Sequence, residues 1–158
     1  MSLDPLFSPL QMGSLILPNR LVMPPMTTNL AGPDGSVTDR LVDFCATRAR
    51  GGVGTIIVEL SIVSVEGKRL PNNVGIWDDG QMEGLVRLAG AIREAGAVAV
   101  IQIGHGGRDS NSLYSGQRPV APSDLQSLFR GTTLEIERPA QLDRDGISRL
   151  GIPRQDRY

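Results

Sequence analysis

Cysteine, histidine and aromatic residues are scarce in this sequence, and their scarcity excludes several classes of protein. The 158 residues include one cysteine, Cys45, one histidine, His105, one tryptophan, two tyrosines and three phenylalanines. A single cysteine cannot form an internal disulfide. No pair of metal ligands occurs at helical spacing, so no metal site is expected. A Gly-x-Gly-x-x-Gly motif is also absent, which leaves a Rossmann dinucleotide fold without support.

Long runs of one charge and long apolar segments are missing as well. Sixteen basic residues stand against seventeen acidic ones, for a net charge of −1. No cluster of like charge marks a nucleic-acid tail or a membrane-binding helix, and no segment approaches the roughly 20 apolar residues that a membrane span needs. The opening segment, MSLDPLFSPL, lacks the basic start and apolar run of a secretory signal. We therefore expect a cytoplasmic protein that binds neither nucleic acid nor membranes.

Nineteen glycines and eleven prolines separate the periodic segments of the chain. The pattern predicts a small N-terminal hairpin arm, followed by alternating strands and helices. The predicted elements are a strand at 20–24, a helix from Thr38 to the Gly51–Gly52 pair, a strand at 53–59, a helix ending at Gly96, a strand at 97–103 and a last helix from Asp143 to Leu150. This order favours right-handed βαβ units around a parallel sheet, which is an α/β fold.

Polar residues follow the predicted strands at their carboxyl ends, where parallel α/β folds place their functional groups. The groups are a hydroxyl of Thr27 or Thr28, the Glu59 carboxylate, the Gln102 amide, the His105 ring and the Arg108 cation. Glu59 has a structural interpretation, as a group that caps the barrel end or pairs with an arginine. His105 has one too, as a hydrogen-bonding residue of a glycine-rich loop. The GHGG segment is not followed by a clear helix N-terminus, which argues against a phosphate cradle. Spacing alone names no reaction.

Six segments, in order along the chain, carry a more specific signal: LFSPLQMGSLILPNRLVMPPMTTN, DGSVTDRLVDFCATRARGGVGTIIVE, VSVEG, GIWDDGQMEGL, QIGHGGR and RPVAPS. From about Pro5 to Leu150 they resemble the start of the Old Yellow Enzyme family of flavin oxidoreductases, in its NADH:flavin oxidoreductase and dienoyl-CoA reductase branch. The resemblance implies the N-terminal part of a (βα)8 TIM barrel, with about three βα units after the hairpin arm. It also implies non-covalently bound FMN, a hydride from NADH or NADPH, and transfer to an electron-poor alkene such as an α,β-unsaturated carbonyl.

The same resemblance assigns cofactor-binding roles to residues of this chain. The backbone of Pro24, Pro25 and Met26 would run beside the flavin. The Thr27 hydroxyl would hydrogen-bond the reactive ring and tune its reduction potential. The Gln102 amide would pair with the pyrimidine edge of the flavin, because an amide both donates and accepts.

Two positions, Leu60 and Asn29, differ from the residues that family members carry there, and His105 is not one of the family's catalytic histidines. Leu60 stands at a flavin-contacting position where relatives carry a small residue. Asn29 matches a position that is a substrate-contacting tyrosine in some relatives, which makes it the candidate for substrate binding. The family's carbonyl-binding pair, His-x-x-His or His-x-x-Asn after the fourth strand, has no match in this chain. His105 belongs to a different loop motif and is interpreted as structural, so the catalytic residues are left unassigned.

The resemblance divides the chain into residues 1–150, part of an FMN-binding barrel, and residues 151–158, a divergent tail that a frameshift or truncation would explain. We expect such a partial barrel to be inactive alone and to expose apolar surface. The main alternative is a non-catalytic half-barrel fragment that only associates with itself or with a complementary half. An aldolase-type lyase is the weaker alternative, because its Schiff base needs a lysine at a strand end and the sole lysine, Lys68, lies in a loop.

Overall fold

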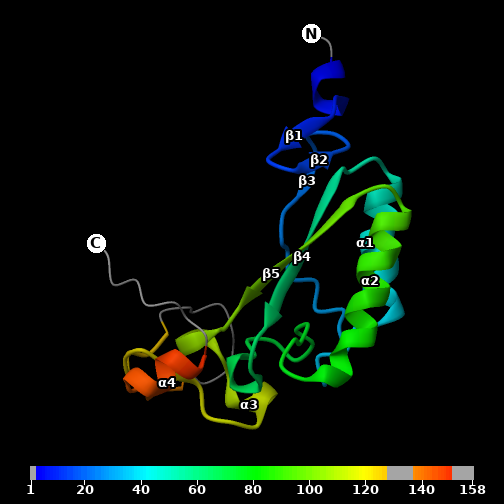
Figure 1. Ribbon diagram of the computed structural model, residues 1–158. Helices are drawn as coiled ribbons and strands as arrows, with labels where there is room; N and C mark the ends of the chain where they lie inside the picture. Colours follow the sequence, from blue (N-terminus) through cyan, green and yellow to red (C-terminus); the bar gives the residue numbers. More distant parts are fainter. Residues whose placement is uncertain (1–2, 128–136, 151–158) are drawn as a thin grey trace.

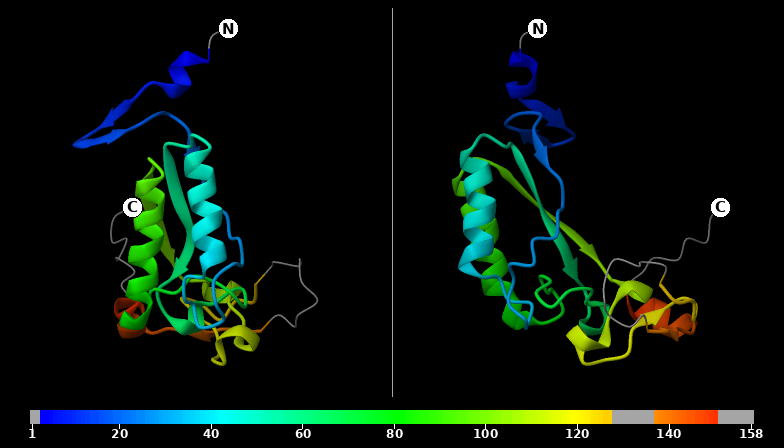
Figure 2. Two further views of the ribbon diagram at one scale, coloured as in Figure 1. Left: turned by 90° about the vertical axis from the view of Figure 1, so that its right-hand side faces the viewer. Right: turned by 180° about the vertical axis from the view of Figure 1, so that it is seen from behind.

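A three-stranded parallel sheet forms the centre of the computed structural model, which describes residues 3–127 and 137–150. Its strands, in spatial order, are β3 (Val22–Met23), β4 (Thr55–Ile62) and β5 (Val98–Gly104). Helices α1 (Asp39–Arg50) and α2 (Met82–Glu94) pack side by side on one face of the sheet (Figures 1 and 2). Strand β4 pairs with both neighbours in the parallel sense. The predicted alternation of strands and helices is therefore confirmed.

The N-terminal arm is the predicted hairpin, preceded by a short turn. A 3-10 turn, η1 (Asp4–Phe7), leads into antiparallel strands β1 (Leu10–Met12) and β2 (Leu15–Leu17). Gly13 takes a φ of 61° between the strands, a left-handed conformation that glycine adopts without steric cost. The arm lies beyond the amino ends of the sheet strands (Figure 1). It therefore lies far from the strands' carboxyl ends.

Helix α1 begins and ends where its capping residues predict. The Thr38 hydroxyl accepts a hydrogen bond from the Leu41 N–H at 3.3 Å, as an N-cap does. Gly52 follows the helix with a φ of 98°, a conformation that ends helices. The buried side chains of the helix are Leu41, Cys45, Ala46 and Ala49. All four lie on the predicted apolar face.

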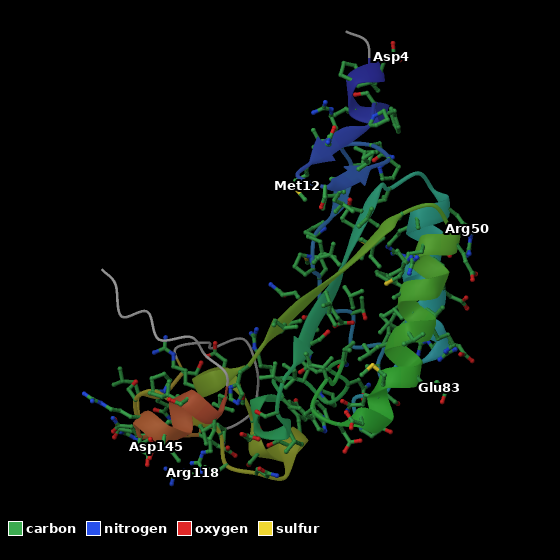
Figure 3. All side chains as sticks on the ribbon, viewed as in Figure 1. Asp4, Met12, Arg50, Glu83, Arg118 and Asp145 are labelled. Atoms are coloured by element: carbon green, nitrogen blue, oxygen red, sulfur yellow. The ribbon has the colours of Figure 1, made fainter. Side chains whose placement is uncertain are left out.

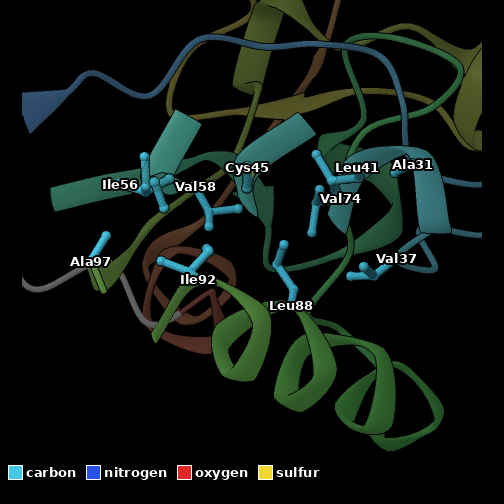
Figure 4. Packing of buried hydrophobic residues seen from close by; sticks show 11 residues of the cluster. Ala31, Val37, Leu41, Cys45, Ile56, Val58, Val74, Leu88, Ile92 and Ala97 are labelled. Atoms are coloured by element: carbon cyan, nitrogen blue, oxygen red, sulfur yellow. The ribbon is translucent and has the colours of Figure 1, made fainter. Parts of the chain in front are cut away.

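The hydrophobic core lies between the two helices and the sheet (Figure 4). Its buried members are Ala31, Val37, Leu41, Cys45, Ala49, Ile56, Val58, Val74, Leu88, Ile92 and Ala97. Ile56 and Ile92 have no exposed surface, and burying a side chain of this size contributes about 1.5–3 kcal/mol. Because side chains alternate along a strand, Ile56 and Val58 point to the same face of the sheet, towards the helices.

Helix α2 buries fewer of its apolar side chains than its sequence predicts. Apolar residues at 82, 85, 86, 88, 89 and 92 predict one stripe that faces the sheet. Leu88 and Ile92 are buried, but Met82 is 58% exposed and Val86 is 63% exposed. Helix α1 covers one flank of α2, and no helix of the described ranges covers the other (Figure 2). Leu85, Leu88 and Ala89 of α2 line a groove of about 210 Å³ between α2 and β5.

Short elements complete the described chain. The 3-10 turns η2 (Val65–Gly67) and η3 (Asp79–Gln81) connect β4 to α2, and after β5 come η4 (Gly107–Asp109), α3 (Ser112–Ser115), β6 (Val120–Ala121), β7 (Ala140–Gln141) and α4 (Arg144–Arg149). Asp143 caps α4 by accepting a hydrogen bond from the Gly146 N–H at 2.7 Å, so this predicted helix is confirmed. The parallel pair of β6 and β7 was not predicted, because two-residue strands carry no periodicity. The predicted tail at 151–158 lies outside the described residues.

Candidate functional site

The carboxyl ends of β3, β4 and β5 lie at one edge of the sheet, here named the carboxyl edge, and the loops that follow β4 and β5 meet there. The Gly106 N–H donates to the Gly67 carbonyl at 3.0 Å, and the Asn111 N–H donates to the Lys68 carbonyl at 3.0 Å. These bonds join the loop after β5 to the loop after β4. Side chains of both loops crowd together at this end of the molecule (Figure 3). The carboxyl edge is the place where the sequence predicts the functional groups.

A β-bulge in β4 brings two predicted site regions together. The register pairs on either side of the bulge are Val58 with Ile101 and Ser61 with Ile103. Two residues of β4, Glu59 and Leu60, therefore stand opposite one residue of β5, Gln102. Because a bulge re-aims side chains locally, Glu59 and Leu60 do not follow the simple alternation of the rest of β4.

Glu59 is buried, with 3% of its surface exposed, and its carboxylate binds Thr28. The Thr28 N–H donates to Oε2 at 2.9 Å, and the Thr28 hydroxyl donates to Oε1 at 2.5 Å. Burial raises the pKa of the Glu59 carboxyl, and the hydrogen bonds from Thr28 oppose that shift. The sequence left open an arginine partner for Glu59. The structure shows no such pair in its described ranges, whose ion pairs are Arg87–Asp39 and Arg138–Asp124.

Of the two neighbouring threonines, Thr27 is the one left exposed. Its hydroxyl makes no hydrogen bond with any other described residue, whereas the Thr28 hydroxyl is bound to Glu59. Met26, which precedes it, is 62% exposed. The spacing of the residues left both hydroxyls as candidates. The structure separates them, because only the Thr27 hydroxyl is free to meet a ligand.

Asn29, the predicted substrate contact, is held by Asn72. It has a φ of 58° and is the one non-glycine residue with positive φ in the part of the chain that the structure describes. The Asn72 N–H donates to Asn29 Oδ1 at 3.0 Å, and the Asn72 side-chain amide donates to the Asn29 carbonyl at 3.4 Å. Asparagine adopts this conformation more readily than most residues. The side-chain oxygen of Asn29 is thus occupied.

Gln102 is exposed near the end of β5. Its side-chain amide makes no hydrogen bond with the other described residues. Ala99 packs against the hydrophobic core under the helices, so strand alternation directs Gln102, three positions further on, to the opposite face. Its amide is therefore available at the carboxyl edge.

Leu60 is half-buried and lies over the backbone of β5. A Cβ added to Gly104 would lie 2.7 Å from Leu60 Cδ1. Leu60 therefore occupies the space that a side chain at position 104 would need. The leucine at this position, where relatives carry a small residue, is accommodated by a glycine on the adjacent strand.

The His105 ring packs between the loops that follow β4 and β5. The Gly107 N–H donates to Nδ1 at 2.8 Å, so a neutral ring carries its proton on Nε2. Nε2 is buried without a partner among the described residues. Burial lowers the pKa of the ring, and the nearby Glu66 opposes the shift. A Cβ on Gly67 would lie 2.7 Å from His105 Cδ2, so the ring packs directly on that glycine. The structural role of His105 stays a prediction, which this packing supports.

Lys68, the residue that a lyase would need, is 3% exposed. Its Nζ donates to the Pro33 carbonyl at 2.6 Å, and burial lowers its pKa while Asp34 opposes the shift. The lysine thus holds a loop and is not presented at a strand end. No cluster of three or more metal-ligating side chains occurs in the described ranges. Their helices are all too short or too polar to cross a membrane.

Sequence patterns did not reveal the partners of Glu59 and Asn29. Thr28 and Glu59 are 31 positions apart, and Asn29 and Asn72 are 43 positions apart. Contacts over such separations are set by tertiary structure. The adjacent polar pairs Thr27–Thr28 and Asn72–Asn73 were the available signal, because a loop carries polar groups of this kind where its backbone needs partners.

Comparisons with known proteins agree with this geometry. The family model described as "NADH:flavin oxidoreductase / NADH oxidase family" matches residues 5–149. The chain is 45% identical over 129 residues to the NADH oxidase of Thermoanaerobacter brockii. The match covers 80% of this chain and 20% of that protein. The chain is also 34% identical to the Old Yellow Enzyme homologue of Zymomonas mobilis, with a TM-score of 0.78 over 92% of this chain and 41% of that one.

Morphinone reductase is a further structural match. It is 34% identical to this chain, with a TM-score of 0.76 over 92% of this chain and 41% of its own, and a matched structure of it is a complex with tetrahydroNAD. The chain thus spans about a fifth of the matched NADH oxidase and about two fifths of these solved chains. The predicted fold is confirmed, because the described sheet and helices correspond to part of a TIM barrel.

Proposed function

Because the chain belongs to the NADH:flavin oxidoreductase / NADH oxidase family, whose cofactors are FMN and NAD(P)H, we propose that its carboxyl edge is the flavin-facing part of an ene-reductase. In this proposal a hydride from NADH or NADPH reaches an electron-poor alkene, such as an α,β-unsaturated carbonyl compound, by way of FMN. The cofactor supplies the redox chemistry, and the protein supplies its position and its hydrogen bonds.

The observation that carries the proposal is a pair of polar side chains without partners at the carboxyl edge. Thr27 follows β3 and Gln102 lies near the end of β5, so the two groups flank the central strand β4. Both are exposed, and neither side chain makes a hydrogen bond within the described residues. A hydroxyl and an amide fit the polar edge of a flavin, which presents both donors and acceptors. Both groups are held close to strands, which keeps them in place.

The segment from Pro24 to Met26 supports the same proposal. Pro24 and Pro25 have no N–H, so this stretch offers a flat ligand few unsatisfied donors. The exposed Met26 side chain supplies polarisable apolar surface beside it. In the proposed site the ring lies along this segment, with the Thr27 hydroxyl at one end and the Gln102 amide across β4. Leu60, on β4, would contact the ring with a larger side chain than the small residue that relatives carry at this position.

Substrate binding is assigned to Asn29 in the same proposal. Its Oδ1 is held by Asn72, so the group that remains for a substrate is the Nδ2 amide, a hydrogen-bond donor. No residue of the chain matches the family's carbonyl-binding pair. We therefore propose that residues 1–150 contribute the flavin-facing portion of the barrel and that the 158-residue chain alone does not turn over an enone.

The test is a titration of FMN with the purified chain, followed by the flavin fluorescence and the absorbance band near 450 nm. We expect weak but saturable binding, because few of the contacts that a whole barrel provides are present. Gln102→Leu should weaken binding, whereas Gln117→Leu, at an exposed glutamine of the loop after α3, should not. An anaerobic assay with cyclohexenone and NADPH should show no turnover.

Three outcomes would contradict parts of the proposal. Absence of any saturable change in the flavin signal at high protein concentration would remove the flavin site from this chain. Equal effects of Gln102→Leu and Gln117→Leu would remove Gln102 from it. Stoichiometric FMN with turnover comparable to that of an intact relative would refute the expectation of inactivity.

The second candidate function, a non-catalytic half-barrel that only self-associates, rests on the open edge of the sheet. Val100, Ile101 and Ile103 of β5 are 39%, 41% and 64% exposed. An uncovered apolar strand of this kind is a template for pairing with another chain. Light scattering across a range of protein concentrations measures this association. If the chain associates but leaves the FMN signal unchanged at every concentration, the second candidate replaces the first.

A further inference from the structure

We propose that Glu59 is a positioning residue that fixes the flavin-facing segment Pro24–Thr27 through its hydrogen bonds to Thr28. The inference rests on the proposed function for the role of that segment, and on the observed contacts for the role of Glu59. It adds a function to a buried carboxylate that no cofactor or substrate contact explains.

The segment needs such an anchor because little else fixes it. Strand β3 ends at Met23. Pro24 and Pro25 donate no hydrogen bond, and no backbone hydrogen bond joins residues 24–27 to other described residues. The first residue after β3 with a fixed backbone amide is Thr28, whose N–H is held by Glu59 at 2.9 Å. The position of Thr27 therefore depends on how firmly its neighbour is held.

The Glu59 carboxylate binds both the backbone and the side chain of Thr28. Each carboxylate oxygen accepts one hydrogen bond from the same residue, one from the backbone and one from the side chain. The hydroxyl of Thr28 also accepts from the Leu30 N–H at 3.2 Å. A side chain at 59 thus sets both the place of the Thr28 backbone and the direction of its hydroxyl. The hydroxyl cannot turn towards the flavin side without leaving the carboxylate.

The bulge in β4 explains why the carboxylate reaches this loop. Glu59 and Leu60 together face one residue of β5. The extra residue bends the strand at its carboxyl end and leaves Glu59 aimed at the loop after β3. On the far side of Thr28, Asn72 holds Asn29 and the Thr38 hydroxyl donates to the Leu30 carbonyl. The downstream side of the loop therefore has anchors of its own, and the upstream side relies on Glu59.

The test measures the segment with and without flavin in the 158-residue chain. Amide hydrogen exchange, without FMN, should speed up about tenfold or more at the Thr28 amide in Glu59→Leu, because its hydrogen bond to a charged acceptor is lost. Exchange in the core of α1 should rise only by the loss of global stability, and the increase at Thr28 should exceed it. Thr28→Val removes the same side-chain contact from the loop side, and the double variant should lose little more than either single one. Glu94→Gln, on the exposed side of α2, is the control.

Two further readouts separate positioning from a general structural role. Glu59→Gln should restore slow exchange, since its amide oxygen accepts from the Thr28 N–H and its NH2 group can donate to the Thr28 hydroxyl oxygen. With FMN added, the flavin absorption maximum should shift in Glu59→Leu and return in Glu59→Gln. A variant that only weakened the core would speed exchange throughout α1 and β4, and Gln would not correct it at the loop alone.

The outcomes are distinguishable from those of the proposed function. Unchanged exchange at the amide of residue 28 in both Glu59→Leu and Thr28→Val would overturn the positioning role, whatever the flavin does. Uniformly faster exchange over the whole sheet would overturn it as well. If the wild-type chain does not perturb FMN but the loop loses protection as expected, the proposed function fails and the anchoring by Glu59 stands.

Discussion

Removal of the hydroxyl should destabilise the protein at Thr28 but leave its stability nearly unchanged at the neighbouring Thr27. Thr28→Val removes the hydroxyl that donates at 2.5 Å to the carboxylate of Glu59, a side chain with 3% of its surface exposed. Loss of a hydrogen bond to a charged group costs about 1.5–3 kcal/mol. The free energy of unfolding should fall by about that amount. Thr27→Ala removes an exposed hydroxyl without a partner among the described residues, so the free energy of unfolding should change by no more than about 0.5 kcal/mol.

The assay is urea denaturation followed by fluorescence of Trp77, the single tryptophan of the chain. Trp77 reports on the core side of the sheet, because its ring lies against Gly35 and Gly75. In a flavin-loaded, intact version of the protein, Thr27→Ala should in turn shift the FMN reduction potential while the fold is retained. Equal losses of stability in the two variants, or a stability loss confined to Thr27→Ala, would refute the assignment of the hydroxyls.

Three further predictions follow from Leu60, His105 and Cys45. Leu60→Ala should tighten FMN binding in a flavin titration, because it frees space at the ring. In urea denaturation it should lower the free energy of unfolding by about 1–2 kcal/mol, less than the cost for a fully buried leucine. Burial holds the pKa of His105 below its ordinary value of 6.5, so its contribution to stability is present above pH 6.5 and is lost as the pH falls through the lower pKa of the folded state. His105→Asn should therefore flatten that part of the stability curve, and an unchanged curve would contradict the burial of the ring. Burial raises the pKa of the Cys45 thiol to about 11, so the native protein should react with a disulfide reagent at pH 8 far more slowly than the urea-unfolded chain, and equal rates would contradict the packing of α1.

The fold was predictable from the sequence wherever local chemistry determines it. Thr38 and Asp143 were predicted as helix caps from their side chains and the residues that follow them, and both accept the expected hydrogen bonds. The unbroken β-branched run of β4 predicted a strand covered on both faces, and every residue of β4 is buried or half-buried. The pattern of α2 misled in part, because periodicity marks a face as apolar but does not say what covers it. Val86 is apolar and lies on a flank that no described helix covers.

The site was predictable in its location but not in its contacts. Thr27, Glu59 and Gln102 were expected at the carboxyl ends of strands, and all three lie at the carboxyl edge. The choice of Thr28 as partner of Glu59 depends on a bulge in β4 that no sequence period reveals, since it shifts the register by one residue. The hydrogen bond from Asn72 to Asn29 joins residues 43 positions apart, because the loop after β4 folds back beside the loop after β3. Such contacts are properties of the folded chain.

The most direct test of the account is an NMR titration of the isotope-labelled 158-residue chain with FMN. The account predicts saturable shifts of the Gln102 side-chain NH2 group and of the Thr27 backbone amide, with the same dissociation constant for both. It predicts much smaller shifts at Val86, an exposed residue of helix α2. Saturable shifts centred on the groove between α2 and β5, with none at Thr27 and Gln102, would contradict the claim that the carboxyl edge binds the flavin.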